Sequence, residues 1–426
     1  MAEPRPAGPP GRSGRPGRAA GDPVCVALLG SGGSIGRQAV DVLAALAPDW
    51  RVVALATGTQ SALLEEQARR LRPAAAALGT DAALDLPSGC AQVRGPDALE
   101  ALATRDDVDL VVVGTGGVVS LRPVLAALRA GKVVATANKE TLVAGGHLVM
   151  AEARARAAER AADDPRDPLA TPLGWLRPID SEHSAIWQCL AGEEIEEVLR
   201  LVLTASGGPF LDTPLEAFPG ITPERALRHP TWTMGAKITI DSATLANKGL
   251  EIVEAHWLYG MPYERIDVVV HPQSLVHSAV LFRDGSLKAQ LGTPDMRLPI
   301  QYAVTHPRRR PSPAAPPDLV AAGRLDFRAP DEARFPALRI AREAGALGSR
   351  ATAALITADE VAVARFLGGT LDFPGIPRLL GEAVARYGAG PDQAPGVDEL
   401  VALDREVRDA FGAPGTGRGT APGPAA

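Results

Sequence analysis

The sequence predicts an α/β protein with three parts: an N-terminal Rossmann-type doubly wound sheet, a central α+β domain and a C-terminal helical domain. Over the first third of the chain, short apolar runs alternate with helical stretches, and the first run ends in a glycine-rich turn. This alternation is typical of βα units in a parallel sheet. After residue 332, apolar residues recur at helical spacing instead, which predicts a group of helices.

Length and composition exclude several classes of protein. A chain of 426 residues has room for two or three domains. Its net charge of -6 gives no electrostatic reason to expect nucleic acid or an anionic membrane as a partner. No uncharged apolar run approaches the length of a membrane span. Cys25, Cys90 and Cys189 share no metal-ligand spacing, which favours a reducing cytoplasm over a disulfide framework.

Two segments at the ends of the chain are predicted to be disordered tails. Residues 1–23 and 412–426 are rich in proline and glycine and lack the apolar residues that a core requires. The first segment has no apolar region of the kind a secretory signal carries, so we do not expect one. An organelle transit peptide is the alternative there.

The first βα unit predicts a phosphate cradle. An apolar run at Val24–Leu29 leads into Gly30-Ser31-Gly32-Gly33-Ser34-Ile35-Gly36, and a helical pattern follows through Leu46. Glycines let the backbone approach a pyrophosphate, and the helix N-terminus supplies amide donors. A plain βα turn is the alternative, because a glycine turn by itself is weak evidence. Strand-like runs at Val52–Ala56, Val108–Val113 and Val133–Ala135 favour the cofactor-binding sheet.

The end of the second strand bears on which dinucleotide binds. An NAD site usually places an acid there to hold the ribose 2′-hydroxyl. Here the turn after Thr57 reads Gly58-Thr59-Gln60, without an acid. The turn therefore disfavours NAD and leaves room for a 2′-phosphate, although it offers no basic side chain either.

Two later turns fall where open α/β sheets bind ligands, outside the carboxyl ends of the strands. Gly114–Gly117 follows the third run, and Asn138-Lys139-Glu140 follows the fourth. The alternative for Asn138-Lys139-Glu140 is a polar helix start, with Glu140 near the positive end of the helix dipole. Residues 151–174 read as a helix followed by a surface loop.

Paired carboxylates open the central domain. Asp180 and Glu182 are separated by one residue, so in an extended segment both side chains would point to one face. Such a pair repels unless a cation lies between, and Mg²⁺ or Mn²⁺ prefers oxygen ligands. A solvated edge is the commoner explanation of such a pair. We retain the metal hypothesis because a third acid, Glu251, lies downstream among polar residues.

A serine between glycines follows the apolar run Leu199–Leu203. Ser206 and the adjoining glycines suit a phosphate or a mobile loop that closes on one. The chain then lacks periodicity as far as Met234, and an irregular segment of this length is usually functional or disordered. His229 and Trp232 lie near its end; a core aromatic is the alternative for Trp232.

The next stretch predicts a strand at Lys237–Asp241 and a helix from Ser242 to Leu258. Asn247, Lys248 and Glu251 then share one helical face, although Lys248 and Glu251 could be a simple surface pair. A phosphate needs a cation and neutral donors. The chain supplies these through Ser206, His229, Ser242, Asn247 and Lys248.

The remaining chain predicts structure without chemistry. A helix begins within Gly292–Tyr302, and an arginine run at 308–310 lies in a linker with several prolines, which we interpret as solvated. Helices are expected at Ala337–Ala344, Ala351–Phe366 and Ile376–Tyr387. The expected domains are 24–177 for the cofactor, 178–305 for catalysis, 306–331 as linker and 332–411 as helical buttress.

At these motifs, from about Val24 to about Phe411, the sequence resembles the 1-deoxy-D-xylulose 5-phosphate reductoisomerases. The resemblance implies an NADPH- and metal-dependent enzyme at the second step of the non-mevalonate isoprenoid pathway. The chain departs from the family pattern in places. The family usually has Thr or Ser at Gly32, a basic residue is frequent at Thr59 or Gln60, and 357–360 lacks the usual asparagines.

The resemblance also implies residue roles. The metal ligands would be Asp180, Glu182 and Glu251, which with Lys139 and His229 form the catalytic set. The segment that carries Trp232 would be a lid, and His277 would lie near the site. Substrate would contact Lys139, Ser181, Glu182, Ser206, His229, Trp232, Ser242, Asn247, Lys248 and Glu251. The cofactor would contact Gly30, Ser31, Gly32, Gly33, Ser34, Ile35, Gly36, Gly58, Thr59, Gln60, Asn138, Glu140 and Gly235.

The hypothesis is therefore that 1-deoxy-D-xylulose 5-phosphate is rearranged and reduced to 2-C-methyl-D-erythritol 4-phosphate. NADPH would be the reductant and Mg²⁺, Mn²⁺ or Co²⁺ the Lewis acid. The resemblance implies a cytoplasmic homodimer. Two alternatives remain: a metal-dependent reductase or dehydrogenase of another sugar phosphate that acts without rearrangement, and a non-catalytic nucleotide sensor on a reductase fold.

Overall fold

The computed structural model describes residues 21–390 and 394–412, so the predicted tails lie almost wholly outside the described residues. The chain forms two compact units that alternate along the sequence. Unit 1 comprises Met1–Asn138, Val149–Asp180 and Met296–Ala314. Unit 2 comprises Lys139–Leu148, Ser181–Asp295 and Ala315–Ala426. The domain boundaries that the sequence predicts stay a prediction.

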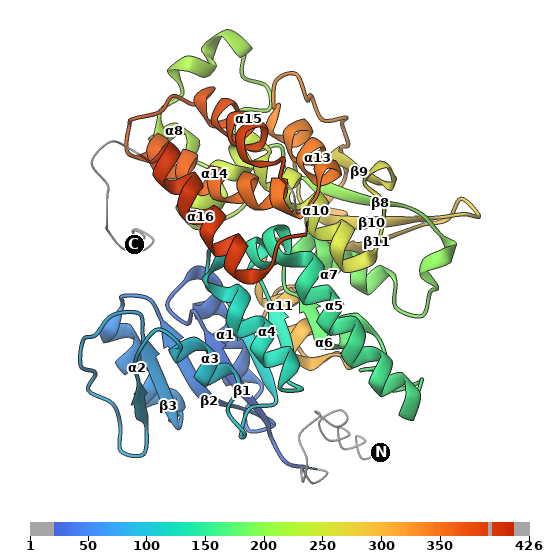
Figure 1. Ribbon diagram of the computed structural model, residues 1–426. Coiled ribbons are helices and arrows are strands. Elements are labelled where there is room, and N and C mark those ends of the chain that lie inside the picture. Colours follow the sequence, from blue (N-terminus) through green and yellow to red (C-terminus); the bar gives the residue numbers. More distant parts are fainter. Residues whose placement is uncertain (1–20, 391–393, 413–426) are drawn as a thin grey trace. The chain divides into compact units, whose positions relative to one another are not determined.

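Unit 1 is built on a seven-stranded sheet whose strands run in the order β4-β3-β2-β1-β5-β6-β7 (Figure 1). Every neighbouring pair is parallel. The strands are β1 (Val24–Leu29), β2 (Trp50–Thr57), β3 (Ala75–Leu78), β4 (Ala91–Val93), β5 (Leu110–Val113), β6 (Val133–Thr136) and β7 (Leu176–Pro178). The Rossmann-type prediction is confirmed.

The strand order reverses between β1 and β5, because the chain builds outward from β1 in one direction and then returns to its other side. Ligands bind at such a switch point in open α/β sheets. Both faces of a parallel sheet are covered by helices, and the central strands β1 and β5 are accordingly apolar throughout. The covering helices of unit 1 include α1 (Ser34–Ala45), α2 (Ser61–Leu71), α3 (Ala98–Ala103), α4 (Leu121–Arg129), α6 (Pro172–Trp175) and α11 (Arg297–Thr305).

Three strands of unit 1 were not predicted from the sequence, because each is atypical in composition or length. β3 is almost entirely alanine, and β4 and β7 have only three residues each. Alanine is depleted in strands, so tertiary context decides here. The interpretation of 151–174 is confirmed, since α5 (Lys139–Asp163) ends there and an irregular connection leads to α6. α5 contributes residues to both units.

Unit 2 contains a mixed sheet of four strands in the order β11-β10-β8-β9. β8 (Val198–Ala205) and β9 (Ile266–Val270) are parallel, whereas β10 (Val276–Phe282) is antiparallel to β8 and to β11 (Leu287–Leu291). Helix α7 (Ser181–Cys189) packs on β10 and β11. The sheet therefore fixes the helix that begins directly after Asp180.

The C-terminal helices of unit 2 form the group drawn from orange to red in Figure 1. α14 packs against α13, α15 and α16, and α13 packs in turn on α10. The principal helices are α9 (Ala236–Thr244), α10 (Ala246–Tyr259), α13 (Ala337–Leu347), α14 (Ser349–Leu367), α15 (Gly375–Tyr387) and α16 (Val397–Phe411); α8 (Pro223–Ala226) and α12 (Leu319–Ala322) are single turns. The predicted helical region is confirmed.

The strand predicted at Lys237–Asp241 is wrong, because these residues lie in helix α9. Alternation of polar and β-branched residues suggested a strand. In the fold, Lys237 and Asp241 form an ion pair of 2.8 Å at i,i+4 spacing, which only a helix brings together. The single helix predicted from Ser242 is also wrong, since Leu245 has φ 58° and separates α9 from α10.

Two smaller interpretations also need correction. The extended backbone assumed for Asp180 and Glu182 is wrong, because α7 begins at Ser181. The arginine run is not wholly solvated: the Arg310 guanidinium lies 5.6 Å from the centre of the Trp50 ring and pairs with Asp49 at 3.6 Å. Arg310 thus packs as well as carrying charge.

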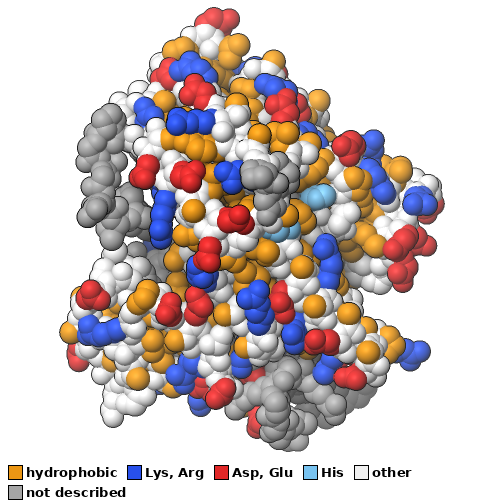
Figure 2. Space-filling view, viewed as in Figure 1, with side chains coloured by type: hydrophobic (Ala, Val, Ile, Leu, Met, Phe, Trp, Pro, Cys, Tyr) orange, Lys and Arg blue, Asp and Glu red, His pale blue; other side chains and the backbone are white. Residues whose placement is uncertain are grey.

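The described part of the chain includes no helix with the length and apolar character needed to cross a membrane. On the face of the molecule that Figure 2 shows, acidic and basic side chains are interspersed with apolar ones.

Candidate active site

Three carboxylates lie close together at helices α7 and α10. Asp180 directly precedes α7 and is positioned by it, Glu182 lies in the first turn of α7, and Glu251 lies on α10. Their ligand oxygens all lie within 4.8 Å of one another. An all-oxygen set of this kind suits a hard divalent cation such as Mg²⁺. We call these three residues the carboxylate cluster.

Two lysines and one side-chain amide contact this cluster. The Lys139 ammonium lies 3.5 Å from a Glu251 oxygen and donates to Asn247 Oδ1 at 2.5 Å. The Lys248 ammonium lies 3.0 Å from Glu182 and also bonds Glu251. Asn247 donates to Glu251 through its side-chain amide. The prediction that Asn247, Lys248 and Glu251 share one helical face is confirmed.

Burial makes this pairing necessary. Glu251 is 1% exposed and Lys248 is 3% exposed. A buried charge is costly unless it is paired and hydrogen-bonded. The two lysines contact Glu182 and Glu251, and the three carboxylates together offer the oxygen ligands that a hard divalent cation prefers. The residues present therefore fit such a cation.

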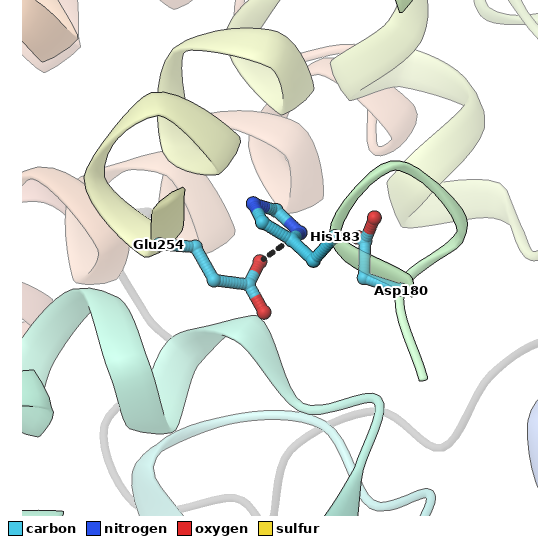
Figure 3. Close-up of side chains that lie close together, drawn as sticks. All are labelled: Asp180, His183 and Glu254. Carbon is cyan, nitrogen blue, oxygen red and sulfur yellow. Dashed lines mark ion pairs between the residues drawn. The ribbon is translucent and has the colours of Figure 1, made fainter. Parts of the chain in front are cut away.

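A buried histidine–glutamate pair, His183 and Glu254, lies close to Asp180 (Figure 3). His183 Nδ1 lies 3.4 Å from Glu254 Oε2, and its Nε2 lies 3.0 Å from the Glu251 carbonyl oxygen, to which it donates. Asp180, His183 and Glu254 also offer ligand atoms within 4.8 Å of one another. Because His183 is held between Glu254 and the backbone of α10, we interpret the pair as support for Glu251.

A second group of polar side chains, which we call the anion pocket after its predicted role, comes together in unit 2. Ser206 follows β8 in a glycine-containing turn, Ser242 lies on α9, and His229 lies in the irregular segment between them. His229 Nε2 is 2.9 Å from Ser206 Oγ and 3.1 Å from Ser242 Oγ. Gly208 donates its amide to Ser206 at 3.3 Å. These are neutral donors of the kind that hold a phosphate.

The backbone fixes the tautomer of His229. Its Nδ1 accepts the amide N–H of Thr231 at 3.1 Å and that of Trp232 at 2.8 Å. A nitrogen that accepts carries no proton, so the neutral ring holds its proton on Nε2. Burial also lowers the pKa of His229 below its usual value. The ring therefore presents an N–H donor to the pocket.

Trp232 and His277 lie together beside this pocket. Their ring centres are 5.9 Å apart. Trp232 is half-buried, not a core residue, while His277 is buried, and burial lowers its pKa. The structure thus brings His277 to the segment that sequence analysis interpreted as a lid.

Lys237 joins two buried aspartates of unit 2. Its ammonium lies 2.8 Å from Asp241 and 2.6 Å from Asp359, and both carboxylates are 0% exposed. Burial raises the pKa of Asp241 well above its usual value, as does the neighbouring charge of Asp359, and Lys237 offsets only part of this rise. We call these residues the lysine–aspartate cluster. It ties α9, which carries Ser242, to α14.

In unit 1, the glycine turn lies at the switch point of the sheet. A Cβ at Gly30, which has φ +88°, would lie 2.5 Å from the backbone of Gly114. A Cβ at Gly36 would lie 2.0 Å from the Gly30 carbonyl oxygen. Both positions therefore require glycine, and the turn opens helix α1 at Ser34. Close backbone packing and a helix N-terminus form a cradle that fits a pyrophosphate.

Three further predicted cofactor residues, Asn138, Glu140 and Gly235, have distinct environments. The Asn138 side chain donates to the carbonyl oxygens of Thr115 at 2.7 Å and Gly117 at 2.9 Å, which shapes the turn after β5. Glu140 is buried in the first turn of α5. Gly235 is exposed and precedes α9.

Sequence analysis gave no role to His183, Glu254, Lys237 or Asp359. A signal existed for the first two, because Glu254 follows Glu251 by three residues and His183 follows Asp180 by three. Residues at this spacing lie on one helical face. Lys237 and Asp359 are 122 residues apart in sequence, counted as 359 − 237, and no local pattern links them.

Three family models match the chain. Residues 26–146 match 1-deoxy-D-xylulose 5-phosphate reductoisomerase, and residues 176–259 match the C-terminal domain of that family. Residues 291–410 match a DXP reductoisomerase C-terminal domain. The matched regions include the glycine turn and the carboxylate cluster.

Individual relatives and solved structures agree. The chain is 47% identical to the reductoisomerase of Pelotomaculum thermopropionicum, over 90% of this chain and 96% of the relative. It is 48% identical to that of Symbiobacterium thermophilum, over 90% and 97%. The Zymomonas mobilis structure with NADPH gives a TM-score of 0.79 at 36% identity, covering 92% of this chain and 98% of that one. A complex with NADPH, fosmidomycin and magnesium gives 0.79 at 34%, covering 91% and 97%. The chain belongs to the 1-deoxy-D-xylulose 5-phosphate reductoisomerase family.

Proposed function

We propose that this chain converts 1-deoxy-D-xylulose 5-phosphate into 2-C-methyl-D-erythritol 4-phosphate with oxidation of NADPH. The observation that carries the assignment of residues is the meeting of Asp180, Glu182 and Glu251 within 4.8 Å, flanked by two lysines. A rearrangement of this kind develops negative charge on adjacent substrate oxygens. The site therefore has to stabilise that charge where it develops.

The carboxylate cluster would hold the divalent cation, which supplies Lewis-acid polarisation of a carbonyl and its neighbouring hydroxyl. Lys139 is 6% exposed, and its ammonium is held in place by a hydrogen bond to Asn247. It would donate to a substrate oxygen as charge develops. Ser181, in the first turn of α7, would contact the substrate beside Glu182.

The anion pocket would bind the substrate phosphate. Ser206, His229 and Ser242 lie within hydrogen-bond distance of one another, so a phosphate oxygen would replace their mutual contacts. Binding the phosphate here supplies energy away from the reacting carbons. Trp232 lies three residues after His229 and donates its backbone amide to that ring, so phosphate binding and coverage by the indole would be coupled.

NADPH would supply the hydride that reduces the rearranged aldehyde. Unit 1 provides its cradle through the glycine turn at the switch point. Asn138 would act through the turn that it shapes, because its amide N–H groups are directed to backbone carbonyls. We propose Glu140 and Gly235 on the cofactor side on the strength of the resemblance.

The assembly and location are also proposals. We propose a homodimer, which analytical ultracentrifugation would test. We propose the cytoplasm as its location, supported by three cysteines that form no disulfide.

The decisive experiment measures NADPH oxidation with 1-deoxy-D-xylulose 5-phosphate, with and without a chelator. Turnover should require the divalent cation, and NMR of the product should show the branched carbon skeleton. An unbranched product would indicate a reductase that does not rearrange its substrate. Fosmidomycin, present in a related structure, should inhibit the reaction.

Glu251→Gln tests the ligand assignment. It should leave NADPH affinity within about twofold and lower turnover by roughly three orders of magnitude, because one charged cation ligand is lost. The matched control is Glu343→Gln on α13, where the carboxylate is 55% exposed; its turnover should not change. Near wild-type turnover in Glu251→Gln would show that the assignment is wrong.

A further inference from the structure

Gly32 and Thr57 compete for one volume in the cofactor cradle of unit 1. A Cβ built at Gly32 would lie 2.4 Å from Thr57 Oγ1 and 3.2 Å from Gln60 Oε1. Real Cβ atoms do not approach an oxygen so closely, so the space beside the backbone of residue 32 belongs to the Thr57 hydroxyl.

The hydroxyl is placed by a rigid strand end. Thr57 is the last residue of β2 and is 8% exposed. Its carbonyl oxygen accepts the Gly79 amide at 2.9 Å, which fixes the backbone at this point. Among the residues that the structure describes, the Thr57 side chain forms no hydrogen bond of its own. A nearly buried hydroxyl thus faces the glycine turn with its donor available.

This position is where a Rossmann-type fold reads the ribose 2′ position. An acid there would accept from the 2′-hydroxyl of NAD, and a basic residue would pair with a 2′-phosphate. The turn Gly58-Thr59-Gln60 carries neither. Gly58 has open space around its Cβ position, so a bulky group is accommodated. The side chains that lie beside the glycine turn here, Thr57 and Gln60, are both neutral hydrogen-bonding groups.

We propose that the Thr57 hydroxyl is the residue that selects NADPH, by donating a hydrogen bond to the 2′-phosphate together with the Gln60 amide. It occupies the volume that a side chain at position 32 would fill, so Gly32 and Thr57 act as a complementary pair. The proposal deepens the proposed function and rests on its use of NADPH.

The test is equilibrium binding, without turnover. Intrinsic fluorescence titrations give dissociation constants of NADPH and NADH for wild type, Thr57→Val and Thr57→Ser. Loss of a hydrogen bond to a charged group should weaken NADPH binding of Thr57→Val by roughly 10- to 100-fold, with NADH changed less than about twofold. Thr57→Ser keeps the hydroxyl and should restore most of the preference. Thr104→Val removes a hydroxyl elsewhere in unit 1 and should change neither constant.

An exchange of positions tests the complementary pair. Gly32→Ser should weaken NADPH binding, because its Cβ meets Thr57 Oγ1. Gly32→Ser combined with Thr57→Ala removes that clash and returns a hydroxyl, so the double variant should bind NADPH better than either single variant. If the double variant loses as much NADPH binding free energy as the two single variants together, the pairing of Gly32 with Thr57 is wrong.

Two failures can be told apart. If wild type shows no preference for NADPH, the use of that cofactor is wrong. If wild type prefers NADPH and Thr57→Val retains the same preference, or loses NADPH and NADH equally, the role of Thr57 at the 2′-phosphate is wrong.

Discussion

Replacing Lys237 with methionine would leave two buried carboxylates facing each other in unit 2. Lys237 lies 2.8 Å from Asp241 and 2.6 Å from Asp359, and both acids are 0% exposed. Removing one partner of a buried ion pair costs roughly 3–5 kcal/mol of unfolding free energy. Because the Lys237 side chain itself remains 30% exposed, we take the lower end and expect a loss of about 3 kcal/mol.

The pH dependence gives this prediction a sign. Burial opposes the charge on Lys237, but its two aspartates outweigh that effect and raise its pKa. The pKa of Asp241 is already raised in the folded state, and loss of Lys237 would raise it further. A carboxyl with a raised folded pKa destabilises the fold increasingly as pH rises above its unfolded value. The deficit of Lys237→Met should therefore be largest at neutral pH and shrink as the solution is acidified.

Urea denaturation followed by circular dichroism measures the loss, and hydrogen exchange of α9 reports it locally. Arg339→Met is the matched control, because it breaks an ion pair with Glu343 whose partners are 53% and 55% exposed; it should cost less than about 1 kcal/mol. Lys237→Met combined with Asp359→Asn should recover part of the loss. If Lys237→Met is no less stable than Arg339→Met, the reasoning about buried charge fails.

Two further predictions concern the anion pocket and the cradle. Nδ1 of His229 accepts two amide N–H groups, and burial lowers the pKa of the imidazole ring. The ring should therefore stay neutral at pH values somewhat below the ordinary histidine pKa of about 6.5. Protonation at lower pH would break those contacts and raise KM for the phosphate substrate; His229→Gln should remove this component, leaving the titration of the substrate phosphate itself. Gly36→Ala places a Cβ 2.0 Å from the Gly30 carbonyl oxygen, so calorimetry should show NADPH binding weakened at least tenfold. Gly220→Ala, at an exposed glycine with open space and no left-handed φ, should leave that binding unchanged.

Sequence alone predicted the parts of the site that depend on local order. The strand, the glycine turn and the helix are adjacent in sequence, so the residues Gly30–Gly36 were enough to predict the cradle. Asn247, Lys248 and Glu251 lie within two turns of one helix, and their shared face followed from helical spacing. Sequence also paired Asp180 with Glu182, although through a strand geometry that the fold does not use.

Contacts between distant segments were beyond such reasoning. Asp359 reaches Lys237 only because α14 packs near α9, and the competition between Gly32 and Thr57 appears only once β2 lies beside β1. The error at Lys237–Asp241 has the same origin. Alternating β-branched residues favour a strand, but the buried i,i+4 ion pair and the packing of α9 override that preference.

The break at Leu245 has a consequence for how this enzyme can vary. Five positions separate Ser242 from Asn247, so on one unbroken helix their side chains would point about 140° apart, from 3.6 residues per turn. The left-handed residue at Leu245 resets the phase between α9 and α10. The directions of the Ser242 and Asn247 side chains are therefore set independently. A small rotation of α9 or α10 about its own axis can change the direction of one side chain without changing that of the other.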